Sequence, residues 1–396
     1  MNQQREVVIL SGVRTAIGDY GGSLKDFPPT ELAAKVVREA VKRAKVDPKE
    51  IGQCVFGNVI HTEPKDMYLS RVACINGGLP ADTGALTLNR LCGSGMQAIV
   101  SASQYILLGD VDAAVAGGAE SMSRGAYANM SQRWGARMGD AKEADMMVGA
   151  LTDPFDTVHM GITAENVAAK CSITRADQDA FAVESHKRAA NAIAKGYFKE
   201  QILPIELKSK KGPIQFDTDE HVRGDASVEG MGKLKAVFAK ENGTVTAGNA
   251  SGINDAAAAV VLMEKSVAAK KGLKPMARLV SYGHAGIDPK IMGLGPVTAV
   301  KNALAKAGLK LEQMDVIESN EAFAAQALGV SKELGMNAAK VNPNGGAVAL
   351  GHPIGATGAI LTVKAMYELA RTGGRYGLIT MCIGGGQGIA AVIERM

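Results

Sequence analysis

Four reactive or hydrogen-bonding side chains stand where apolar runs of the sequence give way to glycine. Cys92 lies in the string Cys-Gly-Ser-Gly, and Cys382 comes shortly before three consecutive glycines. His352, one of only six histidines, lies in Gly-His-Pro-Ile-Gly, and Asn320 begins Asn-Glu-Ala-Phe. Glycine-rich loops allow a ligand to come close to a side chain that a rigid scaffold holds in place. Two thiols, an imidazole and an amide in such loops together suggest acyl transfer that makes carbon–carbon bonds.

Cys92 follows a strand-like run at 86–91 and precedes a helical run at 96–108. The N-terminus of a helix offers partial positive charge and free N–H groups, so we expect the pKa of this thiol to be lowered and the thiolate to be favoured. The ordinary alternative is a small buried hydrophobic side chain. Gly93 and Gly95 favour the reactive interpretation, because they leave the sulfur with little side-chain cover.

The other three side chains have complementary roles. His352 can take the proton of such a thiol, and a second thiol at Cys382 can serve as a base. The glycines after Cys382 can turn backbone N–H groups toward an oxyanion. Asn320 can hold a water or a carbonyl oxygen, although it could equally cap the helix that follows. Because a thioester oxygen becomes negative both in tetrahedral adducts and in an enolate, we expect two oxyanion holes and no need for a metal.

Alternating strands and helices must position these residues. We predict strands at 7–12, 51–60, 86–91, 111–116, 255–264, 276–284 and 315–319, and helices at 31–45, 96–108, 297–307 and 359–369. Thr30 is expected to cap the first helix, and the helix at 96–108 is expected to be buried on all sides. The alternation predicts an α/β protein with a mostly parallel sheet covered on both faces.

The pattern restarts in the second half of the chain. Asn58 precedes Cys92 by 34 residues, and Asn320 precedes His352 by 32 residues. A small-residue helix and a strand ending in glycines then follow in each half. We therefore predict an internal duplication in which Cys92 and His352 face a shared cleft from equivalent helix starts. The predicted units are an N-terminal half at 1–120 plus 250–272, an inserted loop domain at 121–249, and a C-terminal half at 273–396.

Composition narrows the class of protein. The chain has 396 residues, a net charge of +4 and 46% hydrophobic residues, which fits a globular protein of two or more domains. This charge is too small to predict nucleic-acid binding and suits an anionic small ligand. No stretch predicts a signal peptide or a membrane span. Five scattered cysteines without C-x-x-C spacing predict neither disulfides nor a zinc site, and they favour a reducing, cytoplasmic location.

At these motifs the sequence resembles the thiolase family. Cys-Gly-Ser-Gly, Asn-Glu-Ala-Phe, Gly-His-Pro-Ile-Gly and Cys-Ile-Gly-Gly-Gly occur in the family's order, and the likeness covers essentially the whole chain. Within the family it is most similar to bacterial biosynthetic acetyl-CoA acetyltransferases, the β-ketothiolases of polyhydroxyalkanoate producers. The resemblance implies a duplicated, five-layered α/β/α/β/α fold with an inserted loop domain for coenzyme A binding and oligomer contacts. It also implies a homotetramer.

The resemblance implies a role for each matching residue. Cys92 would be the acylated nucleophile, His352 its activator, and Cys382 the acid and base at the α-carbon. His352, and Asn320 through a water, would form one oxyanion hole, and the backbone N–H groups of Cys92 and Gly384 the other. Coenzyme A would be a substrate and product rather than a cofactor, and the positions matching its tunnel are His159, Met160, Arg223, Phe238, Ala247, Ser251, Ala322 and Phe323. Two departures from the family pattern, His61 and Gly230, concern only the detail of this tunnel.

Other functions fit the sequence less well. A dinucleotide-binding enzyme would need a helix and an acidic residue after the glycines at 384–388, but the chain ends at 396. A serine hydrolase would need G-x-S-x-G, which the sequence lacks. A non-catalytic lipid carrier is disfavoured by the intact catalytic set. A degradative thiolase for longer 3-ketoacyl-CoA chains stays open, because it would use the same catalytic groups.

Overall fold

The computed structural model describes residues 5–210 and 212–396. Its strands are β1 Val7–Thr15, β2 Gly18–Asp19, β3 Gln53–Gly57, β4 Gly84–Leu88, β5 Ala113–Ser121, β6 Tyr127–Asn129, β7 Glu143–Asp145, β8 Ile202–Leu203, β9 Ile205–Leu207, β10 Ile214–Phe216, β11 Asn254–Glu264, β12 Ala277–Gly286, β13 Val316–Ser319, β14 Tyr376–Ile383 and β15 Gln387–Arg395. Its α-helices are α1 Pro29–Ala44, α2 Leu69–Asn76, α3 Ser94–Leu108, α4 Met146–Ala150, α5 Met160–Cys171, α6 Arg175–Ala194, α7 Val228–Gly232, α8 Lys265–Lys270, α9 Gly295–Ala307, α10 Ala324–Leu334, α11 Ala347–Leu350 and α12 Thr357–Thr372.

The strands of the two halves share one order. The first half runs β4-β3-β5-β11-β1, and the second runs β13-β14-β15-β12. A parallel bridge between Ile317 and Val341 occupies the place that β4 has in the first half. Antiparallel pairing of β1 with β12, at Val8–Arg278 and Ile9–Ala277, joins the two sets of strands. The predicted duplication is therefore present in the topology.

Matching details repeat in the two halves. The register shifts between Ile9 and Ser11 in β1, and between Leu279 and Ser281 in β12. After each shift the serine hydroxyl donates a 2.7 Å hydrogen bond to a helix carbonyl, that of Ala40 in α1 for Ser11 and of Ala303 in α9 for Ser281. The bulge in β1 therefore fixes α1 on its strand, and the bulge in β12 fixes α9 on its strand in the equivalent way.

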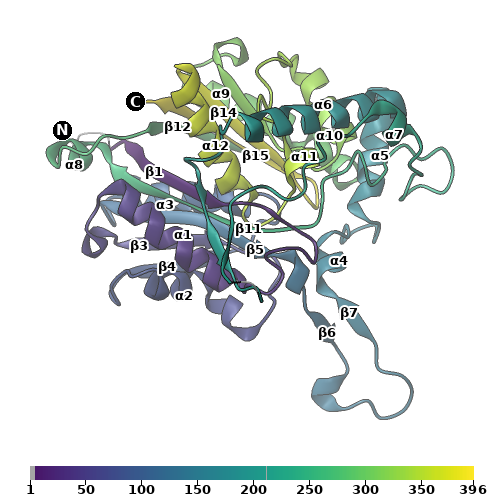
Figure 1. Ribbon diagram of the computed structural model, residues 1–396, viewed down its shortest axis with the longest axis horizontal. Helices are drawn as coiled ribbons and strands as arrows, with labels where there is room; N and C mark the ends of the chain where they lie inside the picture. Colours follow the sequence, from purple (N-terminus) through teal and green to yellow (C-terminus); the bar gives the residue numbers. More distant parts are fainter. Residues whose placement is uncertain (1–4, 211) are drawn as a thin grey trace.

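The layers follow from these contacts. Helices α1 and α2 pack on the strands of the first half, and α9 packs on β12, β14 and β15. Helices α3 and α12 touch each other and touch strands of both halves, so they form the central layer between the two sets of strands (Figure 1). The arrangement is the expected α/β/α/β/α order. It brings the N-terminal ends of α3 and α12, which follow Cys92 and His352 in the chain, to the middle of the molecule.

The expectation of a mostly parallel sheet is wrong. Pairs β3–β4, β3–β5 and β13–β14 are parallel, but β5–β11, β11–β1, β14–β15 and β15–β12 are antiparallel. Only three residues separate β14 from β15, and Gly385 and Gly386 take φ of 78° and 85° there. These glycines allow a turn too short for a parallel crossover, so the chain returns antiparallel.

Two details of the helices also differ from expectation. Thr30 lies inside α1, whose N-cap is Pro28 and whose first residue is Pro29, because proline suits the first turn of a helix. Helix α3 is not buried on all sides, since Leu107 and Leu108 at its end are 42% and 79% exposed. Its middle residues are buried as expected, for example Ile99 and Ala102.

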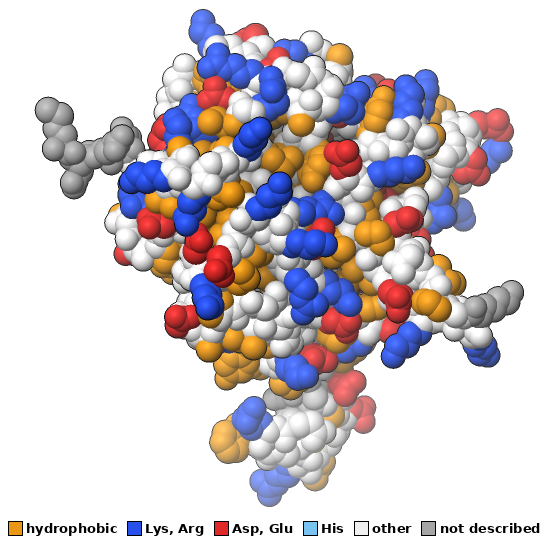
Figure 2. All heavy atoms as spheres, turned by 60° about the vertical axis from the view of Figure 1, so that its left-hand side comes forward, with side chains coloured by type: hydrophobic (Ala, Val, Ile, Leu, Met, Phe, Trp, Pro, Cys, Tyr) orange, Lys and Arg blue, Asp and Glu red, His pale blue; other side chains and the backbone are white. Residues whose placement is uncertain are grey.

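Between β5 and β11 the chain leaves the central layers. Helices α5 and α6 pack against α10, α6 also packs against α11, and β8 pairs with β1. Strands β6 and β7 form a two-stranded arm that projects from the body of the molecule (Figures 1 and 2). Basic and acidic side chains are interspersed on the face drawn in Figure 2, as the small net charge leads one to expect. Among the described residues, no helix combines the length and apolar character needed to cross a membrane.

Candidate active site

A cavity of about 50 Å³ is lined by four of the five predicted catalytic residues, which come from both halves of the chain; Asn320 is not among the lining residues. Eight residues expected from the sequence line it, namely Cys92, Met160, Ser251, Ala322, Phe323, His352, Cys382 and Gly384. Five further lining residues were not expected, namely Leu91, Ala150, Leu151, Met292 and Ile354. Apart from alanine, these are large apolar side chains, and nothing in the sequence distinguishes them from ordinary core residues.

Cys92 lies in the loop between β4 and α3. Leu91 takes a φ of 47°, and the Ser94 hydroxyl ties the loop by accepting from Arg90 N and donating to Leu91 O, at 2.8 and 2.7 Å. The glycine at 95 has a different purpose from the one expected. A Cβ there would lie 2.8 Å from Ala359 N and 3.0 Å from Gly355 O, so the absence of a side chain allows α3 and α12 to meet. The loop with Cys92 is thus held beside α12, the helix that follows His352.

The thiol of Cys92 does not have the lowered pKa that the sequence suggested. Burial raises its pKa to about 11, and the backbone N–H groups of Gly384 and of Cys92 itself oppose this rise only in part. The short loop places the sulfur in an apolar cavity, where desolvation disfavours the charged form. Cys92 is therefore a neutral thiol at pH 7, and it would need a base to act as the nucleophile expected from the sequence.

His352 lies between α11 and α12, five residues before α12 begins rather than at the helix start. Its backbone N–H donates to Asn254 Oδ1 at 2.9 Å, which fixes it to β11 of the first half. Its Nδ1 lies 2.7 Å from Thr357 Oγ1. The ring is buried, and burial lowers its pKa to about 4, so it is neutral at pH 7 and able to accept a proton.

Asn320 lies directly after β13 and next to the histidine. Its Nδ2 is 3.4 Å from His352 Nε2, and its buried Oδ1 has no hydrogen-bond partner. Helix α10 begins only at Ala324 with Phe323 as its N-cap, so Asn320 does not cap that helix. An asparagine with a free buried oxygen beside the catalytic imidazole is suited to holding a water or a substrate group.

Cys382 and Gly384 complete the cavity from the end of β14 and the turn that follows. Burial raises the pKa of the Cys382 thiol strongly, and the neighbouring Cys92 raises it further. Both thiols line the same cavity. A Cβ on Gly384 would lie 2.8 Å from Met160 Cε, so glycine leaves the N–H of this residue accessible beside Cys92.

An aromatic wall continues from the cavity. The His159 ring stacks on Phe238 with centroids 4.5 Å apart, and Phe238 meets Phe323 edge-to-face at 6.2 Å. His159 is also the N-cap of α5, since its Nδ1 accepts from Gly161 N at 3.0 Å. This wall joins the expected tunnel residues to the catalytic cavity.

Four expected tunnel residues do not line the cavity, namely His159 and Phe238 of the aromatic wall, and Arg223 and Ala247. Arg223 has a side chain that is 61% exposed and lies 3.5 Å from Asp19. His221, two residues before Arg223, has its ring close to Gly252, and Gly252 follows the lining residue Ser251. Ala247 is exposed. The departures His61 and Gly230 are also exposed and are not among the lining residues.

Glu120 is a structural element of the site that sequence reasoning missed. This buried carboxylate, near the end of β5, accepts from Asn58 Nδ2 and Ile60 N at 3.1 and 3.0 Å through Oε1. Through Oε2 it accepts from Val59 N and Gly355 N at 3.1 and 2.8 Å. It therefore ties the loop after β3 to the loop that carries His352. An acidic residue ending an apolar strand of small residues was the available signal.

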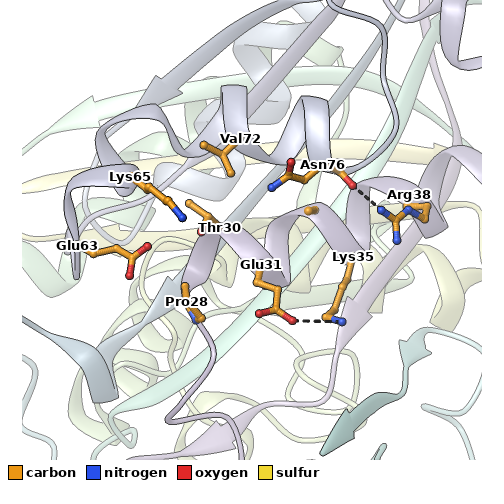
Figure 3. Close-up of a pocket in the computed structure, with 10 residues that line it drawn as sticks. Pro28, Thr30, Glu31, Lys35, Arg38, Glu63, Lys65, Val72 and Asn76 are labelled. Atoms are coloured by element: carbon orange, nitrogen blue, oxygen red, sulfur yellow. Dashed lines mark hydrogen bonds and ion pairs between the residues drawn. The ribbon is translucent and has the colours of Figure 1, made fainter.

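A second, larger groove on the protein lacks the cysteine and histidine side chains that line the cavity described above. The groove in Figure 3 lies between α1 and α2 and has a volume of about 310 Å³. It contains the ion pair Lys35–Glu31 at 3.4 Å, and Arg38 donates to Asn76 O. None of its ten lining residues is a cysteine or a histidine. The larger hollow is therefore not the place for the predicted chemistry.

The fold and this cavity define a thiolase, and the chain belongs to the thiolase family. Residues 7–266 match the thiolase N-terminal domain, and residues 273–395 match the thiolase C-terminal domain. The duplicated fold expected from the sequence is confirmed.

Particular relatives are similar over nearly their whole length. The chain is 66% identical to "Beta-ketothiolase BktB" of Cupriavidus necator, over 99% of this chain and 100% of that protein. The crystal structure of the Bacillus anthracis acetyl-CoA acetyltransferase is 46% identical, with a TM-score of 0.97 over 100% of both chains. The human mitochondrial 3-ketoacyl-CoA thiolase in complex with CoA is 43% identical, with a TM-score of 0.96 over 99% of this chain and 98% of that one.

Proposed function

We propose that this protein is an acetyl-CoA C-acetyltransferase, a β-ketothiolase. It joins two acyl-CoA molecules reversibly into a 3-ketoacyl-CoA and coenzyme A, with acetyl-CoA as the main substrate and propionyl-CoA as a second acyl donor. The observation that carries this function is the meeting of two thiols and a neutral imidazole in one apolar cavity, with the Asn320 amide 3.4 Å from that imidazole. Coenzyme A enters the reaction as substrate and product. The β-ketothiolase and acetyltransferase relatives support the same activity.

The first half-reaction stores an acyl group on Cys92. The Cys92 proton passes to His352 Nε2 while the sulfur attacks the thioester carbonyl. The carbon–sulfur bond to coenzyme A then breaks, and the proton leaves with the coenzyme A thiolate. Because the pKa of Cys92 is raised and that of His352 is lowered, proton transfer has to accompany attack. The backbone N–H groups of Cys92 and Gly384 lie close to this sulfur and are the assigned donors to the tetrahedral oxyanion.

The second half-reaction forms the carbon–carbon bond. The Cys382 proton passes to His352 Nε2 in the same cavity, and the Cys382 thiolate removes a proton from the α-carbon of the second acyl-CoA. The resulting enolate attacks the acyl carbon on Cys92. His352, and Asn320 through a water, are assigned to the enolate oxygen. The 3.4 Å contact between these two side chains and the unpartnered Oδ1 of Asn320 support the assignment. The bond between the acyl group and Cys92 breaks as the 3-ketoacyl-CoA forms, and the proton held on His352 passes to the Cys92 thiolate.

The domain assignment belongs to the same proposal. The N-terminal half comprises 1–120 plus 250–272, the inserted loop domain 121–249, and the C-terminal half 273–396. The inserted domain binds the coenzyme A moiety along the His159–Phe238–Phe323 wall, and Arg223 at its exposed end meets the phosphates. Stacked and edge-to-face aromatic rings beside the cavity support a path for the pantetheine arm.

We also propose that the protein is a homotetramer in the cytoplasm. The projecting β6–β7 arm carries large exposed apolar side chains, including Met130, Trp134 and Met138. Strand β4 lies at the end of the strand order, and its Leu86 is exposed. Such surfaces commonly mark interfaces between subunits. All five cysteines are free thiols, which suits a reducing compartment.

A substrate series tests the function. Purified protein is mixed with acetyl-, propionyl-, hexanoyl- and decanoyl-CoA, and both the acyl adduct on intact protein and the release of 3-ketoacyl-CoA are measured. The small cavity favours the short acyl groups. Faster turnover of decanoyl than of acetyl substrates would contradict the biosynthetic assignment, and absence of any adduct would contradict acyl transfer itself.

A further inference from the structure

The Nδ1 atom of His352 is in contact with the hydroxyl group of Thr357. His352 Nδ1 and Thr357 Oγ1 are 2.7 Å apart, and both side chains are buried. Thr357 is the first residue of α12, five positions after the histidine. Neither the catalytic nor the coenzyme A assignments above include this threonine.

The hydrogen bonds of Thr357 decide where the proton of the neutral imidazole lies. A hydroxyl carries one proton, and Thr357 Oγ1 donates that proton to Pro353 O at 3.1 Å. Toward His352 the same oxygen can then act only as an acceptor. With the Thr357 proton on Pro353 O, Nδ1 carries the ring proton and Nε2 presents its lone pair to the cavity.

The contact on the other side of the ring agrees with this assignment. The atom of Asn320 that approaches Nε2 is the Nδ2 amide, at 3.4 Å, and an amide nitrogen can only donate. A proton on Nε2 would face this donor directly. Two groups on opposite edges of the ring thus favour the same arrangement of protons.

We propose that Thr357 is a positioning residue that fixes the Nδ1–H tautomer of His352 and so keeps Nε2 free to accept the Cys92 proton. The role rests on the proposed function of His352 as the base in acylation. The Cys92 S–H bond breaks, the proton moves to Nε2, and Nδ1–H continues to donate to the Thr357 hydroxyl. Because this partner is neutral, it orients the ring without a negative charge to stabilise the imidazolium, which favours return of the proton to the departing coenzyme A sulfur.

Three variants isolate the hydroxyl from its surroundings. Thr357→Val keeps the side-chain shape and removes the acceptor, whereas Thr357→Ser keeps the acceptor. Thr362→Val is the matched control, because Thr362 is buried in the same helix and its hydroxyl also donates to a carbonyl four residues earlier, Gly358 O at 2.8 Å. No hydrogen bond joins Thr362 to His352 among the described residues.

The tautomer is read by solid-state NMR on protein labelled with ¹³C and ¹⁵N in histidine, near pH 8. Disappearance of signals in His352→Gln identifies this ring among the six histidines. We expect Nδ1–H in the unmodified protein, in Thr357→Ser and in Thr362→Val, and a mixture with Nε2–H in Thr357→Val. An Nε2–H ring in the unmodified protein would overturn the proposal, even if a variant failed to fold.

The kinetic readout is the rate of acetyl transfer to Cys92 in a rapid-quench mass measurement. We expect Thr357→Val to be about 10-fold to 100-fold slower than Thr362→Val, with unchanged affinity for acetyl-CoA and recovery in Thr357→Ser. Equal rates for the two valine variants would overturn the proposal. Failure of the unmodified protein to form any adduct would instead refute the proposed function, while the NMR measurement would still test Thr357.

Discussion

At the residue scale, the thiols of Cys92 and Cys382 and the ring of His352 are uncharged at neutral pH. Burial raises the pKa of both thiols and lowers that of His352. Each proton transfer must therefore be coupled to a bond-making step, because neither a thiolate nor an imidazolium is stable in the site before substrate binds.

The raised pKa of Cys92 predicts how its reactivity depends on pH. The alkylation rate follows the thiolate fraction, which is small at pH 7 and grows about tenfold per pH unit until the pH approaches the pKa of about 11. We expect iodoacetamide labelling of Cys92, followed by peptide mapping, to rise steeply from pH 7 to pH 10. A rate that is already constant above pH 7 would mean that the pKa is lowered after all.

Variants of Cys92 and Cys382 should lose different half-reactions. Cys382→Ala should still accept acetyl on Cys92, because that step ionises no carbon acid. It should lose condensation, and exchange of acetyl-CoA methyl protons with deuterated water, by about 10²–10⁴-fold, as for loss of a general base.

Cys92→Ala provides the complementary measurement, since intact mass should reveal no acetyl adduct on it. Condensation by the Cys382 variant at the unmodified rate, or an acetyl adduct on the Cys92 variant, would contradict the assigned roles.

At the element scale, the close approach of α3 and α12 holds the loops that carry Cys92 and His352 together. Gly95→Ala would place a methyl group against the backbone of Gly355 and Ala359. We expect a loss of about 1–3 kcal/mol in the free energy of unfolding, together with slower acylation, because the helix starts must separate. Urea denaturation and rapid-quench acylation measure the two effects.

Gly232→Ala is the control for this change. Gly232 ends α7, and a Cβ there would have nothing within 4 Å. Its stability should be unchanged or slightly higher. If both alanine variants behaved alike, close packing of α3 on α12 would not be what Gly95 provides.

The elements also explain which features the sequence could reveal. Cys92, Asn320 and Cys382 were identifiable because each interrupts an apolar pattern at or near the end of a strand. Leu91 and Met292 were not, because apolar lining residues look like core residues until the fold is known. The predicted pKa of Cys92 failed for a related reason, since proximity to a helix start is visible in sequence but the desolvation of the cavity is not. The antiparallel return at β14–β15 was missed because alternation with helices was given more weight than the short glycine turn.

At the scale of the whole molecule, the projecting arm predicts how subunits assemble. Trp134 is 92% exposed on the arm, and its replacement by glutamate should prevent burial of the arm against another subunit. Light scattering after size exclusion should detect a smaller assembly for Trp134→Glu than for unmodified protein. Val228→Glu is the control, because Val228 is also exposed but lies in α7, away from the arm. A tetramer that survives Trp134→Glu would remove the arm from the proposed interface.

The repeated bulges of β1 and β12 have a further consequence for the chemistry. The two halves keep the same serine-to-helix bond at Ser11 and Ser281, yet the equivalent loops carry a thiol in one half and an imidazole in the other. If the two halves were identical, the equivalent loops would carry the same side chain, and the cleft would contain either two thiols or two imidazoles. Joining the copies in one chain allows each position to change alone, so the scaffold stays symmetric while its reactive groups become unlike. A duplicated, nearly symmetric scaffold therefore supports one cavity whose two sides carry different reactive groups.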